Sequence, residues 1–578
     1  MNARERPVIK EDVPRTMEAM PWLLLVVFAV ICFGSMSRKS VTVDEFAHFP
    51  AGIYNVFARD WAMNRESPPL VKCLPAISVF ITRPTIAISE SPSQMNAWAY
   101  GYDFMFRNRD AYTFVFGAGR CAIVLLACLA GYLLFRFARE IFGYRAALFG
   151  LFLYVFNPNI IAHSRLTTID VGAACMFLLS VYSFWKFVED PTPRSTVLAG
   201  IAMGLVQLSK FTALILYPAY LLILSIATIH RLRCIDSDPV RTGASQCLRP
   251  TAYFALIVLI SVAVINAGYL LSDTFTPLKE YRFQSTLLKD MAQCCSGSLP
   301  IPLPKEYVSG FDEQLAVSEG GRSFYRGYLM GKHSNEGWWY YYLVAFLVKN
   351  QTALLIILLS SVIFWLMPGT YKPPLNAALC IWVPIIILFG YFSFFTNIPI
   401  GIRYMLPLFP LLFIAAGNLI HLSWMRRRAA RVVMILLMAA YLLPTLIVYP
   451  NYLSYFNLLA GGPGNGHKWL IDSNLDWGQD LPALREYMDA QGIEKIHLGY
   501  FGRVDPRIYG VEYDLADENP ESGVTVISVN FIVGRPYYLL DPETMQLKLI
   551  DADYYQAYRA LEPTRVIGNT LYVFEKNG

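Results

Sequence analysis

Two acidic motifs follow directly after the first apolar run of the chain. The first reads Val43-Asp44-Glu45-Phe46-Ala47-His48, and the second reads Glu66-Ser67-Pro68-Pro69-Leu70. Carboxylates are costly to keep beside a lipid bilayer, so their presence there indicates a function. On a short helix, Asp44 and His48 would share one face, because residues four apart are neighbours. We expect this pair of carboxylates to do chemistry on something that the membrane presents.

A second polar cluster lies at the end of a later apolar stretch. It runs from Asn157-Pro158-Asn159 through His163, Arg165, Thr167 and Thr168 to Asp170. Because Asp and His return to the same predicted membrane face, we predict that both clusters build one shared site. The alternative is that each of these side chains is a solvated helix cap.

Three basic residues accompany the acidic ones. Lys72 follows the Pro-Pro turn, Lys210 interrupts an otherwise apolar stretch, and Arg403 lies in the turn from Asn397 to Tyr404. Basic side chains at this depth favour an anionic headgroup, and phosphate is the ligand that Arg and Lys bind best. Snorkelling of each side chain to lipid phosphate is the alternative.

The composition decides the class of protein that carries these residues. The 578 residues are 55% hydrophobic and 15% aromatic but only 16% charged, and the mean hydropathy is +0.40. These values are typical of a polytopic membrane protein and not of a soluble globular one. The net charge of +5 is small for this length, and the basic residues lie in short blocks between apolar runs. Nucleic acid is therefore not an expected partner.

About eleven membrane spans are predicted. The stretch from Val197 to Thr228 would be nearly 50 Å long as one helix, at ~1.5 Å per residue, and the hydrocarbon core is only ~30 Å thick. We interpret it as a helical hairpin whose tip is Ser209-Lys210-Phe211. The other spans are Trp22 to Met36, Thr113 to Phe135, Arg145 to Phe156, Val171 to Phe187, Thr251 to Leu271, Gln351 to Leu366, Asn376 to Phe395, Met405 to Ile420 and Val432 to Val448.

The distribution of arginines predicts the orientation. Arginines gather near residues 139–145, 231–249 and 426–431, which places these loops on the cytoplasmic side. The N-terminus is then inside, the C-terminus is outside, and the first apolar run is expected to stay as a span and not to be a cleaved signal. A membrane domain, residues 1–449, would carry two large outer loops, 38–110 and 272–337. We expect the chemistry outside the inner (plasma) membrane.

The tail, residues 450–578, is predicted to be a small soluble α/β domain on the same outer side. Asp480 is expected to cap a helix that stops at Gly492. Lys495 to Phe501 and Val524 to Val529 are predicted strands, and Arg565 to Phe574 is a predicted hairpin that turns at Gly568-Asn569. No active site of its own is evident in the tail.

An acidic run at the start of the tail invites a second interpretation. Asp472, Asn474, Asp476, Gly478 and Asp480 alternate as in a calcium loop, but the glycine is one place late and Ala483 stands where Glu is needed. A turn followed by the Asp480 cap is the preferred interpretation. Among the 10 cysteines, a disulfide between Cys73 and either Cys294 or Cys295 in the outer loops is left open, because sequence does not fix connectivity.

Taken together, the motifs resemble the bacterial branch of the dolichyl-phosphate-mannose protein mannosyltransferase-like enzymes. These are phospholipid-carrier-dependent glycosyltransferases of the GT-C superfamily (glycosyltransferase family 39), similar to protein O-mannosyltransferases and lipid A aminoarabinose transferases. Besides the motifs above, with Ala51-Gly52 and Ala162-His163, the resemblance includes Leu208-Ser209-Lys210-Phe211-Thr212, Pro302-Leu303-Pro304, Tyr307, Gly310, Tyr328-Leu329-Met330-Gly331, Trp338-Trp339-Tyr340, Gly401-Ile402-Arg403-Tyr404, Tyr455-Phe456-Asn457 and Asp472 to Asp480.

The resemblance implies a GT-C-type bundle and inverting transfer of a sugar from a polyprenyl-phosphate carrier to an acceptor hydroxyl. It assigns Asp44 as the base, Glu45 as its assistant and Asp170 as a residue that positions the acceptor or a cation. The expected substrate-binding residues are His48, Glu66, Lys72, His163, Arg165, Lys210, Arg403 and Tyr404. No cofactor is certain, and a divalent metal ion on His48, His163, Glu66 or His333 is left open.

The expected partners are the lipid-linked sugar donor, membrane lipids and an acceptor protein or glycan. The short tail lacks β-trefoil repeats, so a protein acceptor does not follow from the resemblance; a glycolipid or a polysaccharide fits as well. A transporter or flippase of lipid-linked sugars is the main alternative function, although no internal repeat supports it. A non-catalytic assembly or sensor protein is a third, which would leave Asp44 and Asp170 unexplained.

Overall fold

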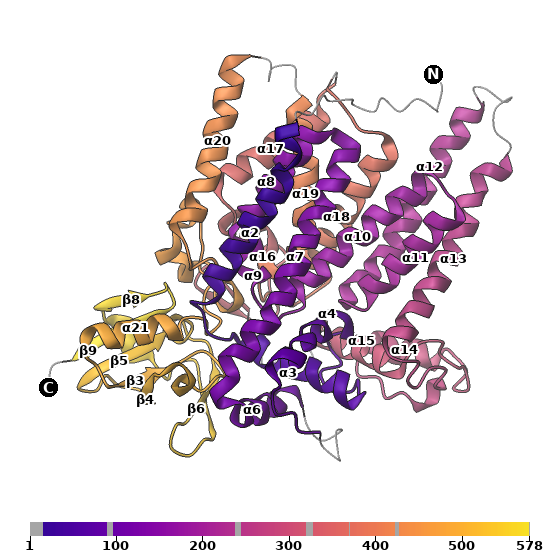
Figure 1. Ribbon diagram of the computed structural model, residues 1–578. Coiled ribbons are helices and arrows are strands. Elements are labelled where there is room, and N and C mark those ends of the chain that lie inside the picture. Colours follow the sequence, from indigo (N-terminus) through magenta and orange to yellow (C-terminus); the bar gives the residue numbers. More distant parts are fainter. Residues whose placement is uncertain are drawn as a thin grey trace.

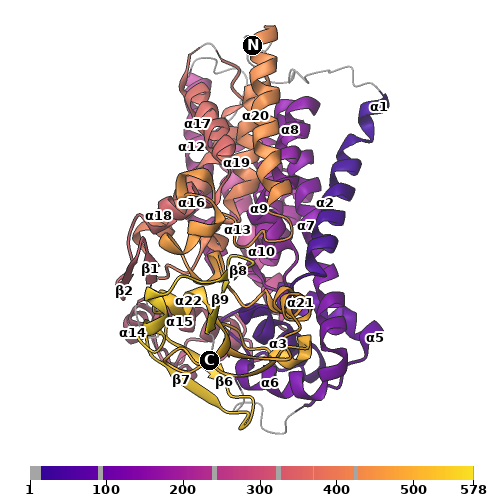
Figure 2. The ribbon, with the colours of Figure 1, turned by 90° about the vertical axis from the view of Figure 1, so that its left-hand side faces the viewer.

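The computed structural model describes residues 15–88, 96–236, 244–319, 327–368, 370–421 and 427–576. Long helices form a bundle, and the tail and both predicted outer loops lie together at one end of it (Figure 1). Helix α1 (Arg15–Glu18) lies at the opposite end, as Figure 2 shows. The first and last described elements are thus at opposite ends of the bundle, as predicted.

Six helical segments of the described residues have the length and apolar composition to cross a membrane. Most of each segment lies in α7 (Tyr112–Phe142), α10 (Asp170–Glu189), α12 (Leu216–Asp236), α13 (Ala244–Gly268), α18 (Leu375–Phe394) or α20 (Arg428–Ile447), and the segments of α7 and α12 begin in the preceding 3₁₀ turns. The chain is therefore a polytopic helical membrane protein, as its composition predicts.

Two further apolar segments are broken. Helix α8 (Tyr144–Val155) meets α9 (Pro158–Ser164) at 64°, and α16 (Tyr341–Lys349) meets α17 (Thr352–Leu366) at 117°. The first break occurs because Asn157 caps a new helix: its side chain accepts hydrogen bonds from the backbone N–H groups of Asn159 and Ile160. If each pair is one span, the described residues contain eight candidates.

The predicted hairpin has its break where the sequence places it. Helix α11 (Pro193–Gln207) ends before Leu208, and a 3₁₀ turn, η4 (Phe211–Ile215), leads into α12. Shorter apolar helices lie at α2 (Met20–Met36), at residues 69–82 and at residues 408–421, where α19 (Leu408–Ala416) continues into η7 (Gly417–His421). A total of eleven spans stays a prediction.

The outer loops fold into short helices that cover one end of the bundle (Figure 1). Loop 38–110 forms α3 (Val43–Ala58), α4 (Pro69–Cys73), η1 (Leu74–Ser78), α5 (Val79–Thr82) and α6 (Ala97–Arg107), with η3 (Arg109–Ala111) before α7. Loop 272–337 forms η5 (Leu278–Glu280), α14 (Thr286–Gln293), α15 (Lys305–Ser318) and the β1–β2 hairpin (Gly327–Leu329, Lys332–Ser334).

Two glycines of the quoted motifs allow these loops to pack closely. A Cβ atom on Gly52 of α3 would lie 1.9 Å from the carbonyl oxygen of Lys72, and one on Gly310 of α15 would lie 2.1 Å from that of Arg65. Side chains at these positions would push the helices apart. The absence of a side chain at these two positions therefore allows α3 to pack against the backbone at Lys72 and α15 to pack against the backbone at Arg65.

The tail contains a five-stranded mixed sheet in the order β4-β3-β5-β9-β8. Strand β3 (Lys495–Gly499) is parallel to β4 (Glu512–Leu515) and β5 (Gly523–Ser528), and β9 (Leu571–Lys576) is antiparallel to β5 and β8 (Arg565–Ile567). The predicted strands and terminal hairpin are confirmed. The remaining elements are α21 (Leu481–Gln491), α22 (Val529–Ile532), the β6–β7 hairpin (Tyr537–Leu540, Leu547–Ile550) and 3₁₀ turns at residues 458–460, 463–468, 472–474, 506–509 and 556–560.

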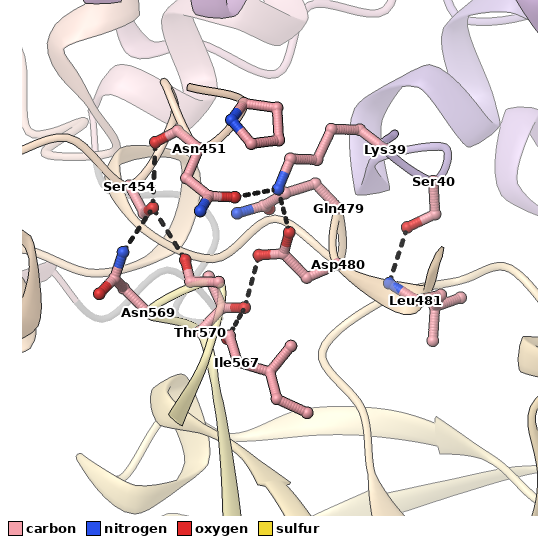
Figure 3. A network of polar contacts seen from close by, with 12 residues as sticks. Lys39, Ser40, Asn451, Ser454, Gln479, Asp480, Leu481, Ile567, Asn569 and Thr570 are labelled. Atoms are coloured by element: carbon pink, nitrogen blue, oxygen red, sulfur yellow. Dashed lines mark hydrogen bonds and ion pairs between the residues drawn. The ribbon is translucent and has the colours of Figure 1, made fainter. Parts of the chain in front are cut away.

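The predicted role of Asp480 as a helix cap is wrong. Helix α21 follows Asp480 and ends at Gln491 before Gly492, as expected, but the Asp480 side chain makes no cap hydrogen bond. Figure 3 shows that its carboxylate instead accepts from the ammonium of Lys39 and the hydroxyl of Thr570. Lys39 also donates to Asn451. Asp480 therefore joins the tail to the segment that follows the first helix of the bundle.

Two alternatives that the sequence left open on the outer side are not found. The carboxylates of the calcium-like run point to separate partners: Asp472 to Arg535, Asp476 to Ser528 and Asp480 to Lys39. They do not converge on one point, so they form no calcium loop. Cys73, Cys294 and Cys295 are all free thiols, so the disulfide that the sequence left open is not formed.

Candidate active site

A cavity of about 790 Å³ lies where the bundle, both outer loops and the tail meet. Its walls come from α3, the start of α10, η4, α15, the turn before α19 and the tail, including Asp472, Trp477 and Arg535. The volume is in the range of sites for small molecules, roughly 300–1,000 Å³. The three outer features thus share one space, as the sequence predicts.

Four charged side chains converge in this cavity. Arg403 Nη1 lies 2.6 Å from Asp44 Oδ2 and 3.5 Å from Asp170 Oδ2, and Lys210 Nζ lies 2.7 Å from Asp170 Oδ1. Residues far apart in the sequence, from both predicted acidic clusters and two of the predicted cations, therefore form one network. The prediction that the two acidic clusters meet is confirmed.

Local structure explains how each of the four is presented. Asp44 lies in the first turn of α3 and Asp170 is the first residue of α10, where the helix dipole favours negative charge. Lys210 occupies the break before η4, and Arg403 lies in η6 (Ile402–Met405). Helix ends and turns thus place the four charges at the end of the bundle where the cavity lies.

The four side chains differ in their access to the cavity. The side chain of Asp44 is 19% exposed, whereas that of Asp170 is only 2% exposed. Burial alone would lower the pKa of Arg403, but the two carboxylates outweigh it and raise this pKa well above its ordinary value. Asp44 is therefore the carboxylate that an incoming group meets, and Asp170 is the anchor for both cations.

Aromatic rings cover the two cations. Lys210 Nζ lies 4.3 Å from the ring centre of Tyr404, and the Arg403 guanidinium carbon lies 4.5 Å from the ring centre of Trp477. Such contacts attract a cation to the ring face and limit its movement. Tyr404 was a predicted site residue, whereas Trp477 of the tail was not.

Glu45, the other half of the first motif, does not line the cavity. It is fully buried, and its carboxylate contacts Arg120 at 2.6 Å and the backbone N–H groups of Thr42 and Thr167 at 3.0 and 2.8 Å. Burial raises the pKa of the Glu45 carboxyl, but Arg120 and these hydrogen bonds outweigh it and lower the pKa overall. This closed arrangement favours a structural role for Glu45, and its role as an assistant to Asp44 stays a prediction.

Three of the predicted substrate-binding residues, Lys72, His163 and Arg165, likewise lie outside the cavity lining. Lys72 donates to the carbonyl oxygens of Met63 and Asn64, at 3.3 and 2.7 Å. Arg165 donates to the carbonyl oxygen of Ser35 and stacks on Tyr452. His163 is 1% exposed. Lys72 and Arg165 donate hydrogen bonds to backbone carbonyl oxygens, and neither side chain reaches the cavity.

The metal candidates do not form a ligand set. Among the described residues, no three His, Cys, Asp or Glu side chains are placed to hold a metal ion. His48 and Glu66 line the cavity, but the Nε2 atom of His333 lies 2.7 Å from the carbonyl oxygen of Val533 instead. Burial lowers the pKa of His48, which favours its neutral form. The donor set therefore does not fit a metal.

Sequence reasoning did not identify the residues of the tail that line the cavity. Asp472 and Arg535 form an ion pair of 2.9 Å in the cavity wall, beside Phe501, Arg503 and Tyr537. The signal in the sequence is the acidic run from Asp472 to Asp480, which also belongs to the family resemblance but is interpreted above as a turn before a helix. Bundle and tail also share one apolar core, which includes Trp477, Phe501 and Tyr452. The tail is thus a fixed wall of the site.

Comparison with known families bears on this arrangement. Residues 111–266 match the family model described as "Dolichyl-phosphate-mannose-protein mannosyltransferase". The match confirms the predicted family resemblance. The matched segment extends from α7 into α13 and contains Asp170 and Lys210, while Asp44 and Arg403 lie outside it. No curated protein sequence matches the chain.

Solved structures with a similar arrangement share little sequence with this chain. ArnT from Cupriavidus metallidurans bound to undecaprenyl phosphate is 15% identical with a TM-score of 0.46, over 89% of this chain and 94% of that one. The apo state of the same protein is 14% identical with a TM-score of 0.48, over 96% of this chain and 98% of that one. A third structure is the archaeal oligosaccharyltransferase AglB from Archaeoglobus fulgidus in complex with an inhibitory peptide and a dolichol-phosphate. It is 13% identical with a TM-score of 0.45, over 94% of this chain and 75% of that one.

Proposed function

We propose that the protein is a polyprenyl-phosphate-dependent glycosyltransferase of the GT-C type, which moves a hexosyl or pentosyl group to an acceptor hydroxyl. The observation that carries the proposal is the Asp44, Arg403, Asp170 and Lys210 network in one cavity at the end of an apolar bundle. A carboxylate and two cations at this depth suit a lipid phosphate that leaves and a hydroxyl that attacks. The acceptor is a protein, a glycolipid or a polysaccharide.

The reaction is a single inverting displacement. The acceptor oxygen attacks the anomeric carbon of the sugar, the bond from that carbon to the phosphate oxygen breaks, and the lipid phosphate leaves with the electron pair. The Asp44 carboxylate takes the proton from the acceptor hydroxyl. Arg403 and Lys210 stabilise the charge that grows on the phosphate, so no protein acid and no covalent sugar–enzyme intermediate are needed.

Arg403 couples donor binding to the readiness of the base. Its guanidinium lies 2.6 Å from the Asp44 carboxylate, so that carboxylate is occupied by an ion pair. A lipid phosphate is a better bidentate partner for a guanidinium, and its arrival would draw Arg403 away from Asp44. The mechanism therefore predicts that the donor binds before the acceptor is activated. Asp170 keeps both cations in place throughout.

The proposal includes a location for each part. Residues 1–449 would form an eleven-span catalytic domain in the inner (plasma) membrane, and residues 450–578 an extracytoplasmic domain that closes the cavity. The predicted outer loops and the tail lie together at one end of the bundle (Figure 1), and residues of all three line the cavity, which supports a reaction outside the cytoplasm. Glu66 and His48, which line the cavity, would contact the sugar or the acceptor.

Transfer of a labelled sugar tests the proposal directly. Purified wild type would be mixed with a panel of polyprenyl-phosphate sugars and cell-envelope extract, beside Asp44→Asn and the control Asp110→Asn, an exposed carboxylate outside the cavity. We expect transfer by wild type and the control, and at least about a thousandfold loss in Asp44→Asn. Binding of a donor with no transfer by any protein would favour a transporter of lipid-linked sugars.

A further inference from the structure

Arg503 is an unusual member of the cavity wall because no carboxylate offsets its charge. The described lining residues include four arginines, and three of them have acidic partners: Arg65 contacts Glu306 and Glu313, Arg403 contacts Asp44 and Asp170, and Arg535 contacts Asp472. Within the described residues, Arg503 has no such ion pair, and its Nε–H is buried without a hydrogen-bond partner. A guanidinium stays charged at any physiological pH.

The surroundings of Arg503 are aromatic. Its guanidinium carbon lies 5.4 Å from the ring centre of Trp98 in α6 and 4.6 Å from that of Tyr537 in β6. The hydroxyls of Tyr102 and Tyr537 lie beside the guanidinium, but neither makes a well-directed hydrogen bond within the described residues. Neutral rings and hydroxyls hold the side chain in place without cancelling its charge. The fork of donors is left available to an oxyanion.

The position of this group points to an acceptor and not to the donor phosphate. Arg403 and Lys210 already serve the phosphate beside Asp44, whereas Arg503, Trp98 and Tyr537 come from the tail and from loop 38–110. Trp98 is 36% exposed and presents a flat apolar face. An aromatic face beside a charged fork fits a sugar ring that carries a carboxylate or a phosphate.

We propose that Arg503, Trp98 and Tyr537 form an acceptor subsite that binds an oxyanion-bearing sugar. The oxyanion contacts the Arg503 guanidinium, the ring packs on the aromatic faces, and a hydroxyl of the same acceptor extends through the shared cavity to Asp44. The inference rests on the proposed function, because it names the chemical class of the acceptor for that reaction. It specifies an acidic or phosphorylated glycan in preference to a neutral one.

Calorimetric titration of the full-length protein in nanodiscs tests the subsite. The probes are glucuronate, glucose 6-phosphate and neutral glucose, and the proteins are wild type, Arg503→Gln, Arg503→Lys and the control Arg565→Gln. Arg565 also lies over an aromatic ring, that of Tyr487, but it is exposed and outside the cavity. We expect wild type and the control to bind at least one acidic sugar about tenfold more tightly than glucose.

The variants separate an oxyanion site from a merely structural arginine. Arg503→Gln should lose the preference for the acidic sugar, and Arg503→Lys should keep part of it. Tighter binding of glucuronate would identify a carboxylate, and tighter binding of glucose 6-phosphate a phosphate. Equal affinities for all three sugars in wild type, or an unchanged preference in Arg503→Gln, would overturn the proposal. If Arg503→Gln does not fold, Trp98→Ala should weaken binding of all three sugars, and unchanged binding overturns the proposal.

Sugar transfer distinguishes failure of the subsite from failure of the proposed function. With envelope extract as acceptor, Arg503→Gln should raise the amount of acceptor needed for half-maximal transfer about tenfold, with little change at saturation. Preference for acidic sugars without any transfer by wild type would keep the subsite and refute the glycosyltransferase. If wild type and Arg503→Gln transfer sugar equally at every acceptor concentration, the glycosyltransferase function is kept and the acceptor subsite is refuted.

Discussion

Asp44 and Glu45 are neighbours in the sequence, yet the two carboxylates have opposite surroundings. Asp44 faces the cavity with a side chain that is 19% exposed, and its partner Arg403 is shared with Asp170. Glu45 is fully buried and is enclosed by Arg120, Thr42 and Thr167. Consecutive residues of a helix point about 100° apart, so a single turn of α3 supplies both environments.

The difference teaches that pairing with arginine does not by itself indicate a reacting group. In the closed pair, every lone pair of the Glu45 carboxylate is directed at a fixed donor, so a substrate has nothing to displace. In the open pair, Arg403 divides its donors between two carboxylates and the cavity. Access and incomplete pairing are therefore the features on which the proposal of Asp44 as the base rests.

Removing the closed carboxylate should have the largest effect on stability. Glu45→Gln leaves Arg120 buried without its counterion, and breaking a buried ion pair costs about 3–5 kcal/mol. We expect a large drop in the unfolding temperature of the purified protein, followed by tryptophan fluorescence. Glu543→Gln, an exposed carboxylate, is the matched control. An unfolding temperature equal to that of the control would refute a structural role for Glu45.

Removing a cation from the open cluster should affect transfer more than folding. Lys210→Gln leaves Asp170 paired with Arg403 at 3.5 Å, so the buried carboxylate keeps a partner. Loss of one group that stabilises the leaving phosphate should lower the transfer rate about 100-fold. The exposed Lys468 provides the control Lys468→Gln. Unchanged sugar transfer in Lys210→Gln would remove Lys210 from the mechanism.

The contact between Lys39, Asp480 and Thr570 offers a second closed cluster for comparison (Figure 3). Thr570→Val removes the hydroxyl that donates to Asp480 Oδ2 at 2.7 Å. A hydrogen bond to a charged group is worth about 2 kcal/mol, so the free energy of unfolding should fall by that amount. Denaturant titration of the purified protein measures it. Stability equal to wild type would show that this contact does not hold the tail to the bundle.

Asp476 should give the smallest effect, because it is a buried carboxylate without a cation among the described residues. Burial raises its pKa to about 7, although hydrogen bonds from Ser528 and the backbone of Gly478 oppose the rise. The folded state therefore keeps a proton that the unfolded state has already lost, and stability falls as pH rises through 7. From pH 6 to 8 we expect a loss of about 1.4 kcal/mol.

Asp476→Asn should abolish this slope, since the amide does not titrate. Unfolding temperatures of both proteins at pH 6, 7 and 8 provide the measurement. The same slope in wild type and variant would mean that another group titrates.

Much of the membrane part follows from local sequence. Apolar length predicted the helices, and the charge of Lys210 within a stretch too long for one span predicted the break between α11 and α12. Such features depend on neighbours in the chain, which the sequence displays directly. Asp480 shows the limit: its type and position suited a helix cap, but the buried ammonium of Lys39, far away in the sequence, took its carboxylate.

The site was predictable only in part, for the same reason. Residue type and membrane depth identified Asp44, Asp170, Lys210 and Arg403 as candidates, and the structure brings them together. The same logic also selected Lys72, whose ammonium is satisfied by backbone carbonyls. Which cation reaches the cavity depends on tertiary approach, such as the close contact at Gly52, and no local pattern encodes that.

The most direct test of the account compares Asp44→Asn and Glu45→Gln side by side, with sugar transfer and unfolding temperature measured on the same preparations. The account predicts that Asp44→Asn keeps the unfolding temperature of wild type and loses transfer. It predicts that Glu45→Gln unfolds at a much lower temperature, while the fraction that remains folded still transfers sugar. Transfer retained by Asp44→Asn, or abolished in fully folded Glu45→Gln, would contradict the division of roles between the two carboxylates.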